Sequence, residues 1–325
     1  MQRDDLNYRT TTAYLFLGFL IWPFGAFLYA LKYFRENRSK VIFILFAMLY
    51  GYTFMHRADS ERVASEFLSV ANLRGNEVVE YFEQKTSITI DVFLPLVNIL
   101  VSRLSSSANF LYVVYAFIYF SFVIASTFLL IYLNGENKLS WESGLLLLLF
   151  LFYIRYSAIN GVRYWIACFI FIYSLIQVIY YDKSRLLLLA LITPAIHFSF
   201  LFILPIIVVY YLLKKHLILC YILLIISLMM QTFISSGFIE SLGIFNETRS
   251  ARMEIYLYEG NVERRLAARE GVRWVIKYGA IIARWALGIS IFLPHLIFRH
   301  KITGRDKNMF AFLIIFLSFL QFTSS

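Results

Sequence analysis

The sequence predicts an all-α polytopic membrane protein, a bundle of about 10 transmembrane helices with re-entrant or broken segments and two long external loops. The first observation is composition: the 325 residues are 60% hydrophobic and 15% charged, whereas soluble domains are about 45–50% apolar and about 25% charged. The second is pattern, because apolar runs recur through nearly the whole chain. Residues 1–325 are therefore expected to form one bundle, with the loops 56–87 and 236–273 as parts of it.

The N-terminal part contains two expected spans, 11–31 and 41–55, on either side of a basic loop. The loop 32–40 carries Lys and Arg residues against the single acid Glu36, and the positive-inside rule places such a loop in the cytoplasm. The first apolar run lacks a small-residue cleavage site, so we expect a retained span rather than a signal peptide.

The next stretch is less regular. The long loop 56–87 has apolar residues at helical spacing, which predicts an amphipathic helix at the membrane interface; they are Val63, Phe67 and Val70. The run 88–104 is short for a span and is interrupted by Asp91, Pro95 and Asn98.

The rest of the chain supplies most of the expected spans. One apolar run, 186–213, contains Pro194, His197 and Pro205, and it is either one long kinked span or two half-helices meeting near His197. The other expected spans are 108–133, 141–158, 164–181, 217–235, 274–298 and 309–322.

Two topologies fit these runs. If 88–104 crosses the bilayer and 186–213 is one helix, Arg155 and Arg163 face the cytoplasm. If 88–104 is interfacial or re-entrant and 186–213 is a broken hairpin, these arginines and His197 face the external side together with the two long loops. Both alternatives place equally many Lys and Arg residues inside, so charge does not separate them. The second is favoured because it assigns irregular backbone to the segments that contain proline and polar residues.

A polar site is expected within the apolar region between residues 155 and 199. An arginine near the centre of a spanning helix costs about 2.5–3.5 kcal/mol on insertion scales, so Arg155 and Arg163 are expected to face a cavity, a partner or a substrate. Asn160 and Gly161 interrupt the helix between them, and Pro194 precedes His197. Each residue also has an interpretation without a functional role. Arg155 could extend its side chain from a span end to the membrane surface, and His197 could be a core residue bonded to a carbonyl freed by Pro194.

The loop 236–273 uses arginine to the exclusion of lysine. Arginine binds phosphate and diphosphate bidentately and stays charged when desolvated. Three of its arginines are spaced i, i+4 and i+8, which would place them in one stripe along a helix; they are Arg265, Arg269 and Arg273. This pattern indicates anion binding, and the alternative is a solvated helix held by Glu–Arg pairs.

Several function classes lack their motifs. The sequence has no P-loop, no GxGxxG turn, no HExxH and no Cys/His cluster, so no cofactor and no metal are expected. Much of the net charge of +10 lies in short loops between spans, which argues against nucleic-acid binding. Cys168 and Cys220 lie in apolar runs and are expected to be buried thiols.

The motifs between residues 162 and 200 resemble the core of the EpsG-like, Wzy-type polysaccharide polymerases. In that core an arginine opens an apolar helix and an Ala-rich helix ends in His-x-Ser; here these are Arg163, Ala167, Ala190, Ala195, His197 and Ser199. Upstream, RADSERVASEF resembles the family's Asp-containing segment at Asp59, without its usual Tyr. Downstream, RMEIYLYEG resembles its basic–apolar–Tyr segment, through Arg252, Ile255 and Tyr256.

The resemblance implies a GT-C-like fold and a polymerase of O-antigen or capsule repeat units at the periplasmic face of the bacterial inner membrane. Such an enzyme is a metal-independent glycosyltransferase that moves a glycan from undecaprenyl diphosphate to the non-reducing end of another lipid-linked repeat unit. A chain-length regulator protein is a further implied partner, besides the bilayer. His197 is the first choice for the general base and Asp59 the second. Substrate binding is expected from Arg155, Arg163, Arg252, Tyr256, Arg265, Arg269 and Arg273.

Two other functions fit parts of the sequence. A flippase or transporter of lipid-linked oligosaccharide would also need cationic groups, but it is expected to show internal repeats, and none is visible. A membrane acyltransferase would use His197 as its base and would need a polar partner beside it, for which only Thr193 and Ser199 are near.

Overall fold

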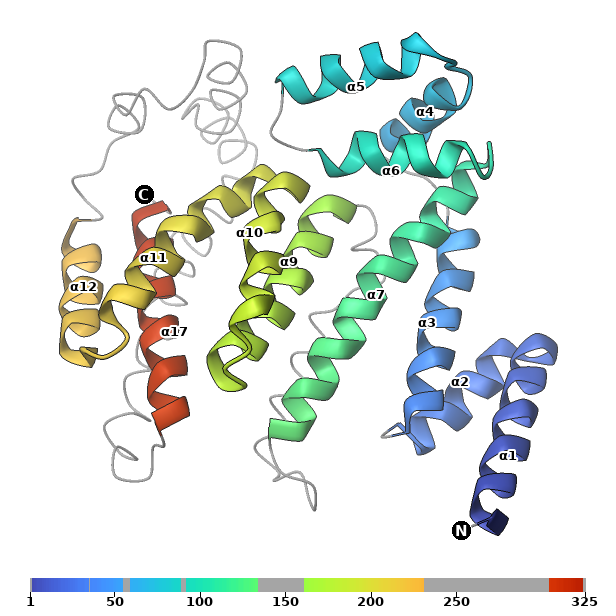
Figure 1. The fold of residues 1–325 in the computed structure, drawn as a ribbon, viewed down its shortest axis with the longest axis horizontal. Helices are drawn as coiled ribbons and strands as arrows, with labels where there is room; N and C mark the ends of the chain where they lie inside the picture. Colours follow the sequence, from blue (N-terminus) through green and yellow to red (C-terminus); the bar gives the residue numbers. More distant parts are fainter. Residues whose placement is uncertain are drawn as a thin grey trace, which may run out of the picture. The chain divides into compact units, whose positions relative to one another are not determined.

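The computed structural model describes residues 2–34, 36–54, 59–88, 92–133, 161–230 and 304–323, and in these ranges every regular element is a helix (Figure 1). The N-terminal helices are α1 (Gln2–Ile21), α2 (Pro23–Lys32), α3 (Asn37–Tyr52), α4 (Asp59–Ala71), α5 (Asn76–Ile88), α6 (Phe93–Ser102) and α7 (Ala108–Leu133). The later ones are α9 (Val162–Leu175), η2 (Ile176–Tyr180), η3 (Ser184–Leu186), α10 (Leu187–Ile196), η4 (Phe198–Phe202), α11 (Ile203–Leu213), α12 (Leu217–Met230) and α17 (Gly304–Thr323).

The expected all-α class is confirmed for the described residues. Within them, two helices are long and apolar enough to cross a membrane, Ala108–Tyr132 and Arg163–Tyr180. The expected spans 141–158 and 274–298 and the loop 236–273 lie outside the described residues. The chain divides into two compact units, residues 1–178 with 184–200 and residues 179–183 with 201–325. The single bundle over the whole chain stays a prediction.

The first expected span, 11–31, is divided at Trp22 between α1 and α2. Pro23 disfavours the helical conformation for the residue before it, and Trp22 has φ −144° and ψ 84°. Helix α1 then folds against α2, and Leu15, Ala26 and Ile42 share one buried apolar cluster.

Helices α3 and α7 run antiparallel and form the largest packed pair of the first unit. The start of α3 lies at the end of α7, where the ammonium of Lys40 sits 4.3 Å from the ring centroid of Phe128. At the other end, a Cβ added to Gly51 would lie 2.6 Å from the carbonyl oxygen of Tyr112 and 2.8 Å from the Cβ of Ala116. Glycine at this position therefore lets the two backbones approach closely.

Helices α9 and α10 continue the same unit. Phe169 of α9 contacts Tyr119 of α7, with 5.5 Å between ring centroids. Helix α10 returns antiparallel to α9, since the Ser174 hydroxyl donates to the Leu186 carbonyl (2.6 Å) and Tyr164 contacts His197 at the opposite ends. The end of α10, which precedes His197, therefore lies at the same end of the unit as the start of α7 and the end of α3 (Figure 1).

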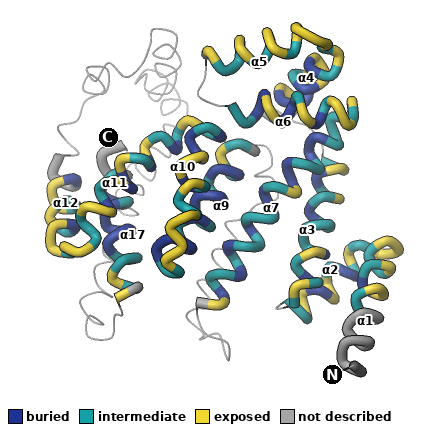
Figure 2. The backbone as a smooth tube through the Cα atoms, in the orientation of Figure 1, coloured by how far each residue is buried: buried dark blue, intermediate teal, exposed yellow. Residues whose placement is uncertain are grey.

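Helices α4, α5 and α6 form a layer at that end (Figure 1). The predicted helix in the loop 56–87 is confirmed, and its apolar stripe is covered by protein. Val63, Phe67 and Val70 are buried, with Phe67 fully so, because α4 packs on α6 and α7 (Figure 2). The stripe is part of the protein core.

Of the two segments that distinguished the topologies, the first contains only a short helix and the second is broken. Helix α6 has 10 residues, about 15 Å of helix, against a hydrocarbon core of about 30 Å. The run 186–213 is broken at His197, which has the extended dihedrals φ −150° and ψ 124°. These features agree with the favoured alternative, while the sidedness of each segment stays a prediction.

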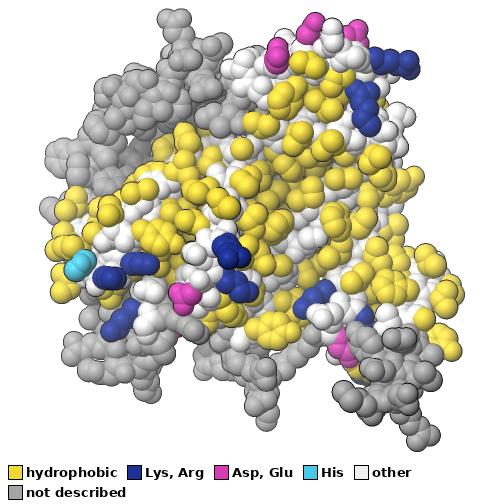
Figure 3. Space-filling model, viewed as in Figure 1, with side chains coloured by type: hydrophobic (Ala, Val, Ile, Leu, Met, Phe, Trp, Pro, Cys, Tyr) yellow, Lys and Arg dark blue, Asp and Glu magenta, His cyan; other side chains and the backbone are white. Residues whose placement is uncertain are grey.

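The surface of the first unit separates apolar from charged groups. Figure 3 shows hydrophobic side chains spread over α3 and α7, with charged side chains gathered over α4 and α5 and near the start of α3. This is the distribution expected of helices whose middle faces lipid.

The second unit contains α11, α12 and α17. Tyr210 of α11 meets Phe312 of α17 with 5.7 Å between ring centroids, and Ala311, Ile314 and Ile315 of α17 are buried. Helix α17 covers the expected last span, 309–322, and its crossing of the membrane stays a prediction.

Candidate active site

The break at the end of α10 is built by the local sequence. Pro194 lacks the N–H that would donate to the carbonyl of Ala190, and the hydroxyl of Thr193 donates to that carbonyl instead (2.6 Å). The His197 N–H still bonds Thr193 O (3.0 Å), after which the chain turns into η4 through a bond from Phe200 N–H to His197 O (3.0 Å). Thr193 and Pro194 are buried, so the turn that carries His197 has a fixed backbone.

The His197 ring lies among aromatic side chains. It stacks on Phe198, with centroids 5.2 Å apart and planes at 21°. It meets Tyr164 edge-on, with centroids 5.5 Å apart and planes at 84°. The side chain is partly exposed, so the imidazole combines a fixed position with access from outside.

The hydrogen bond at Nδ1 determines which tautomer the neutral ring takes. Ser199 donates its backbone N–H to His197 Nδ1 (3.3 Å). A neutral imidazole that accepts at Nδ1 carries its proton on Nε2. In this conformation neutral His197 is therefore a hydrogen-bond donor at Nε2, and it would have to give up the Ser199 bond to take a proton at Nδ1.

Arg163 lies in the first turn of α9, next to Tyr164, which contacts the His197 ring. The N-terminal end of a helix carries a partial positive charge, so a cation there is not placed to stabilise the helix. The residue at the N-cap is Gly161, and no side chain caps the described start of α9. Arg163 and the helix end together make this region electropositive, which suits an anionic ligand.

The layer of α4–α6 is tied to this end by two hydrogen bonds. The Val92 N–H at the start of α6 donates to Ala195 O (2.9 Å), two residues before His197. The hydroxyl of the fully buried Tyr112 donates to Ser60 O (2.7 Å), which fixes the first turn of α4. Asp59 is the first residue of α4, and its side chain lies outside the described residues.

The structure thus brings Arg163 and His197 to one end of the first unit and places the start of α4 at that end. The other predicted site residues lie outside the described residues, so their roles stay predictions; they are Arg155, Arg252, Tyr256, Arg265, Arg269 and Arg273. Within the described ranges, no group of three or more His, Cys, Asp or Glu residues is arranged to hold a metal ion.

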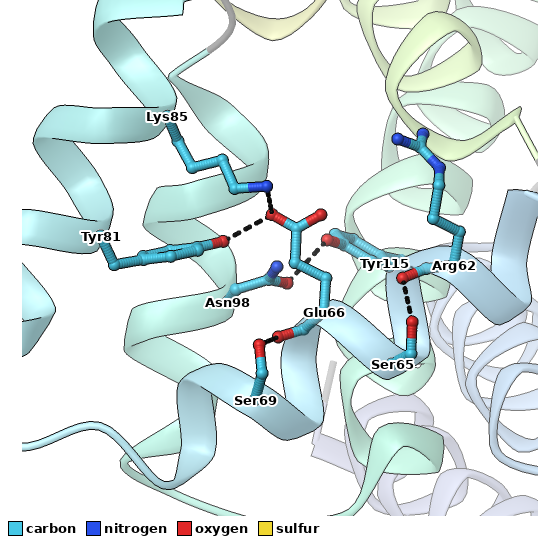
Figure 4. Close-up of polar contacts among 8 residues, drawn as sticks. All are labelled: Arg62, Ser65, Glu66, Ser69, Tyr81, Lys85, Asn98 and Tyr115. Carbon is cyan, nitrogen blue, oxygen red and sulfur yellow. Dashed lines mark hydrogen bonds and ion pairs between the residues drawn. The ribbon is translucent and has the colours of Figure 1, made fainter.

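A polar cluster in the α4–α6 layer was missed by sequence reasoning (Figure 4). Glu66 Oε1 accepts hydrogen bonds from the Tyr81 hydroxyl (2.8 Å) and the Lys85 ammonium (2.9 Å). The Tyr115 hydroxyl donates to Asn98 Oδ1 (3.4 Å). Burial, and then the bond to Glu66, raises the pKa of Tyr81 well above its usual value, so the phenol keeps its proton and donates a hydrogen bond to Glu66.

Only one part of this cluster had a sequence signal. Tyr81 and Lys85 are four residues apart, which places them on one face of a helix. Their partner Glu66 is 15 residues before Tyr81, and only the packing of α5 against α4 and α6 brings the three together.

Comparison with known proteins gives one match. A model of the EpsG family matches residues 76–325, a range that includes Arg163 and His197 but not Asp59. No curated protein and no solved structure matches the chain. Since the matched range is more than half of the sequence, the chain belongs to the EpsG family.

Proposed function

We propose that this chain is a polysaccharide polymerase that transfers a glycan from undecaprenyl diphosphate to the non-reducing end of another lipid-linked repeat unit. Membership of the EpsG family indicates a polysaccharide polymerase-type function, and the family and the apolar helices indicate a membrane protein. The product would be O-antigen or capsule, made at the periplasmic face of the bacterial inner membrane. The partners would be the lipid-linked oligosaccharide and a chain-length regulator protein.

The observation that carries the proposal is that Arg163 and the His197 break lie at the same end of the first unit. Tyr164, adjacent to Arg163, contacts the His197 ring (5.5 Å between centroids), so Arg163 and His197 belong to the same end of the unit. A cation and an N–H donor suit a diphosphate, and a position at a helix end suits a substrate whose lipid stays in the bilayer.

The reaction breaks the bond between the anomeric carbon and the diphosphate oxygen and forms a glycosidic bond to the acceptor hydroxyl. The diphosphate takes the electron pair of the broken bond, and the acceptor hydroxyl loses its proton to a base. Arg163 would stabilise the negative charge that develops on the departing diphosphate. One such donor is worth about 10²–10³-fold in rate in a preorganised site.

Two tasks remain, which are to donate a hydrogen bond to the diphosphate and to accept the proton of the acceptor hydroxyl. The candidates for them are His197 and Asp59. With Ser199 bonded to Nδ1, neutral His197 would donate from Nε2 to a diphosphate oxygen. The base would then be Asp59, whose helix start is held by Tyr112. The first choice of His197 as base is retained as the competing assignment, because a base could use Nδ1 after losing the Ser199 bond.

The other arginines would extend the anionic-ligand site. Arg155 precedes the Asn160–Gly161 break in the sequence, and it would join Arg163 at the diphosphate. The loop residues would bind the carrier or its glycan; they are Arg252, Tyr256, Arg265, Arg269 and Arg273.

Deletion of the gene in its host tests this function. Surface glycan separated on a gel should lose its long-chain ladder and keep a band of a single repeat unit. Complete loss of the glycan would instead indicate a flippase. An unchanged ladder would contradict both functions.

A further inference from the structure

The polar cluster around Glu66 is only partly satisfied by its own members. Both described partners of the carboxylate bind the same oxygen, Oε1, and no described residue bonds Oε2. Asn98 is fully buried, and its Nδ2 faces the Tyr81 hydroxyl without a hydrogen bond of standard geometry. Half-satisfied buried networks are costly.

A purely structural link between α4 and α5 needs no such groups. Replacing a buried ion pair with well-packed apolar side chains is often neutral or stabilising. The Glu66 side chain is 14% exposed and that of Lys85 is 41% exposed, so a ligand can reach both from outside. Figure 4 shows Arg62 extending away from the carboxylate, so Lys85 is its neighbouring cation in the cluster.

The charge pattern selects the class of ligand. The Glu66 carboxylate neutralises Lys85 and repels phosphate, which makes the cluster a poor diphosphate site. A carboxylate oxygen beside an ammonium instead matches two adjacent hydroxyls, one donating to Glu66 and one accepting from Lys85.

The position of the cluster relates it to the His197 end. Asn98 follows Val92 by six residues on α6, about 9 Å along the helix axis, and Val92 is bonded to Ala195 beside the break. The cluster is therefore displaced from the diphosphate region along α6 by a distance that a glycan attached to the diphosphate can bridge.

We propose that Glu66 and Lys85 form a saccharide subsite, which binds hydroxyl groups of the lipid-linked glycan while Tyr81 and Asn98 hold the carboxylate in place. The proposal rests on the polymerase function. Glu66 Oε2 accepts from one sugar hydroxyl, and the Lys85 ammonium donates to its neighbour. The diphosphate stays with Arg163, so the glycan and its leaving group bind to separate parts of the layer.

The test uses the full chain in nanodiscs and, as the probe, the host's repeat-unit oligosaccharide freed from its lipid carrier. Binding is measured by saturation-transfer NMR titration. Glu66→Gln and Lys85→Gln should each weaken binding about 10-fold or more, the loss expected for a hydrogen bond to a charged group. Ser69→Ala is the matched control, because this exposed hydroxyl bonds only the Glu66 main-chain oxygen.

Normal saccharide binding by a folded Glu66→Gln protein overturns the proposal, as does no binding by wild type at millimolar saccharide. If Glu66→Gln fails to fold, the half-exposed Lys85→Gln variant decides in the same way. Binding by wild type without chain elongation would count against the polymerase function and leave the subsite standing. Elongation by wild type together with normal saccharide binding by both variants would contradict the saccharide subsite and leave the polymerase function standing.

Discussion

Replacing His197 with glutamine separates the two roles open to this side chain. A glutamine amide can keep an N–H donor near the position of Nε2, but it cannot take a proton. Because Ser199 occupies Nδ1 at 3.3 Å, we expect a donor role, and His197→Gln should keep more activity than His197→Ala.

The magnitudes of the two roles differ enough to be measured. Loss of a hydrogen bond to a charged group costs about 1.5–3 kcal/mol, or about 10- to 150-fold in rate, and this is the expected loss for His197→Ala. Removal of a general base costs about 10²–10⁴-fold. A donor role therefore predicts His197→Gln within about 10-fold of wild type, whereas a base role predicts equal, larger losses in both variants.

The assay is release of undecaprenyl diphosphate by purified protein given saturating lipid-linked repeat unit. His216→Gln is the matched control, since this exposed histidine lies at the start of α12 and has no proposed role. If the glutamine and alanine variants are equally inactive and both folded, the tautomer argument fails and His197 is the base.

Three further predictions follow from the sequence and the packing. A cysteine at Ser199 should react with an impermeant thiol reagent added from outside, and one at Arg185, at the other end of α10, should not; the reverse pattern would overturn the favoured topology. Gly51→Ala should destabilise the first unit by about 1–3 kcal/mol through overpacking against α7, seen as a lower melting temperature, whereas Gly18→Ala, with nothing within 4 Å, should not. The last prediction concerns the loop arginines Arg265, Arg269 and Arg273. If they hold diphosphate, replacing each with lysine should already shorten the glycan chains, because lysine lacks the planar fork of arginine. Glycan chains of normal length would favour a solvated helix.

Much of the fold could be predicted because apolar runs and prolines act locally. Helix α7 could be predicted from its long apolar run alone. The break at His197 followed from Pro194, whose missing N–H weakens the helix next to it. A second local effect explains why the span 11–31 is interrupted before Pro23, since proline disfavours the helical conformation for the residue before it.

The errors came from contacts between distant residues. The spacing of Val63, Phe67 and Val70 predicts an apolar helix face but not what covers it, and here α6 and α7 cover it instead of lipid. The Glu66 cluster depends on how α5 folds back on α4, which no local pattern encodes. The Nδ1 bond that changes the expected role of His197 depends on one turn of backbone after the break.

The central claim is that Arg163, beside the His197 break, holds the diphosphate while this chain elongates a glycan. Purified protein in nanodiscs, given lipid-linked repeat units alone, should form a ladder of longer glycans and release undecaprenyl diphosphate. The Arg163→Ala protein should fold, insert and form no ladder. A missing ladder with wild type, or an equal ladder with Arg163→Ala, would contradict the account.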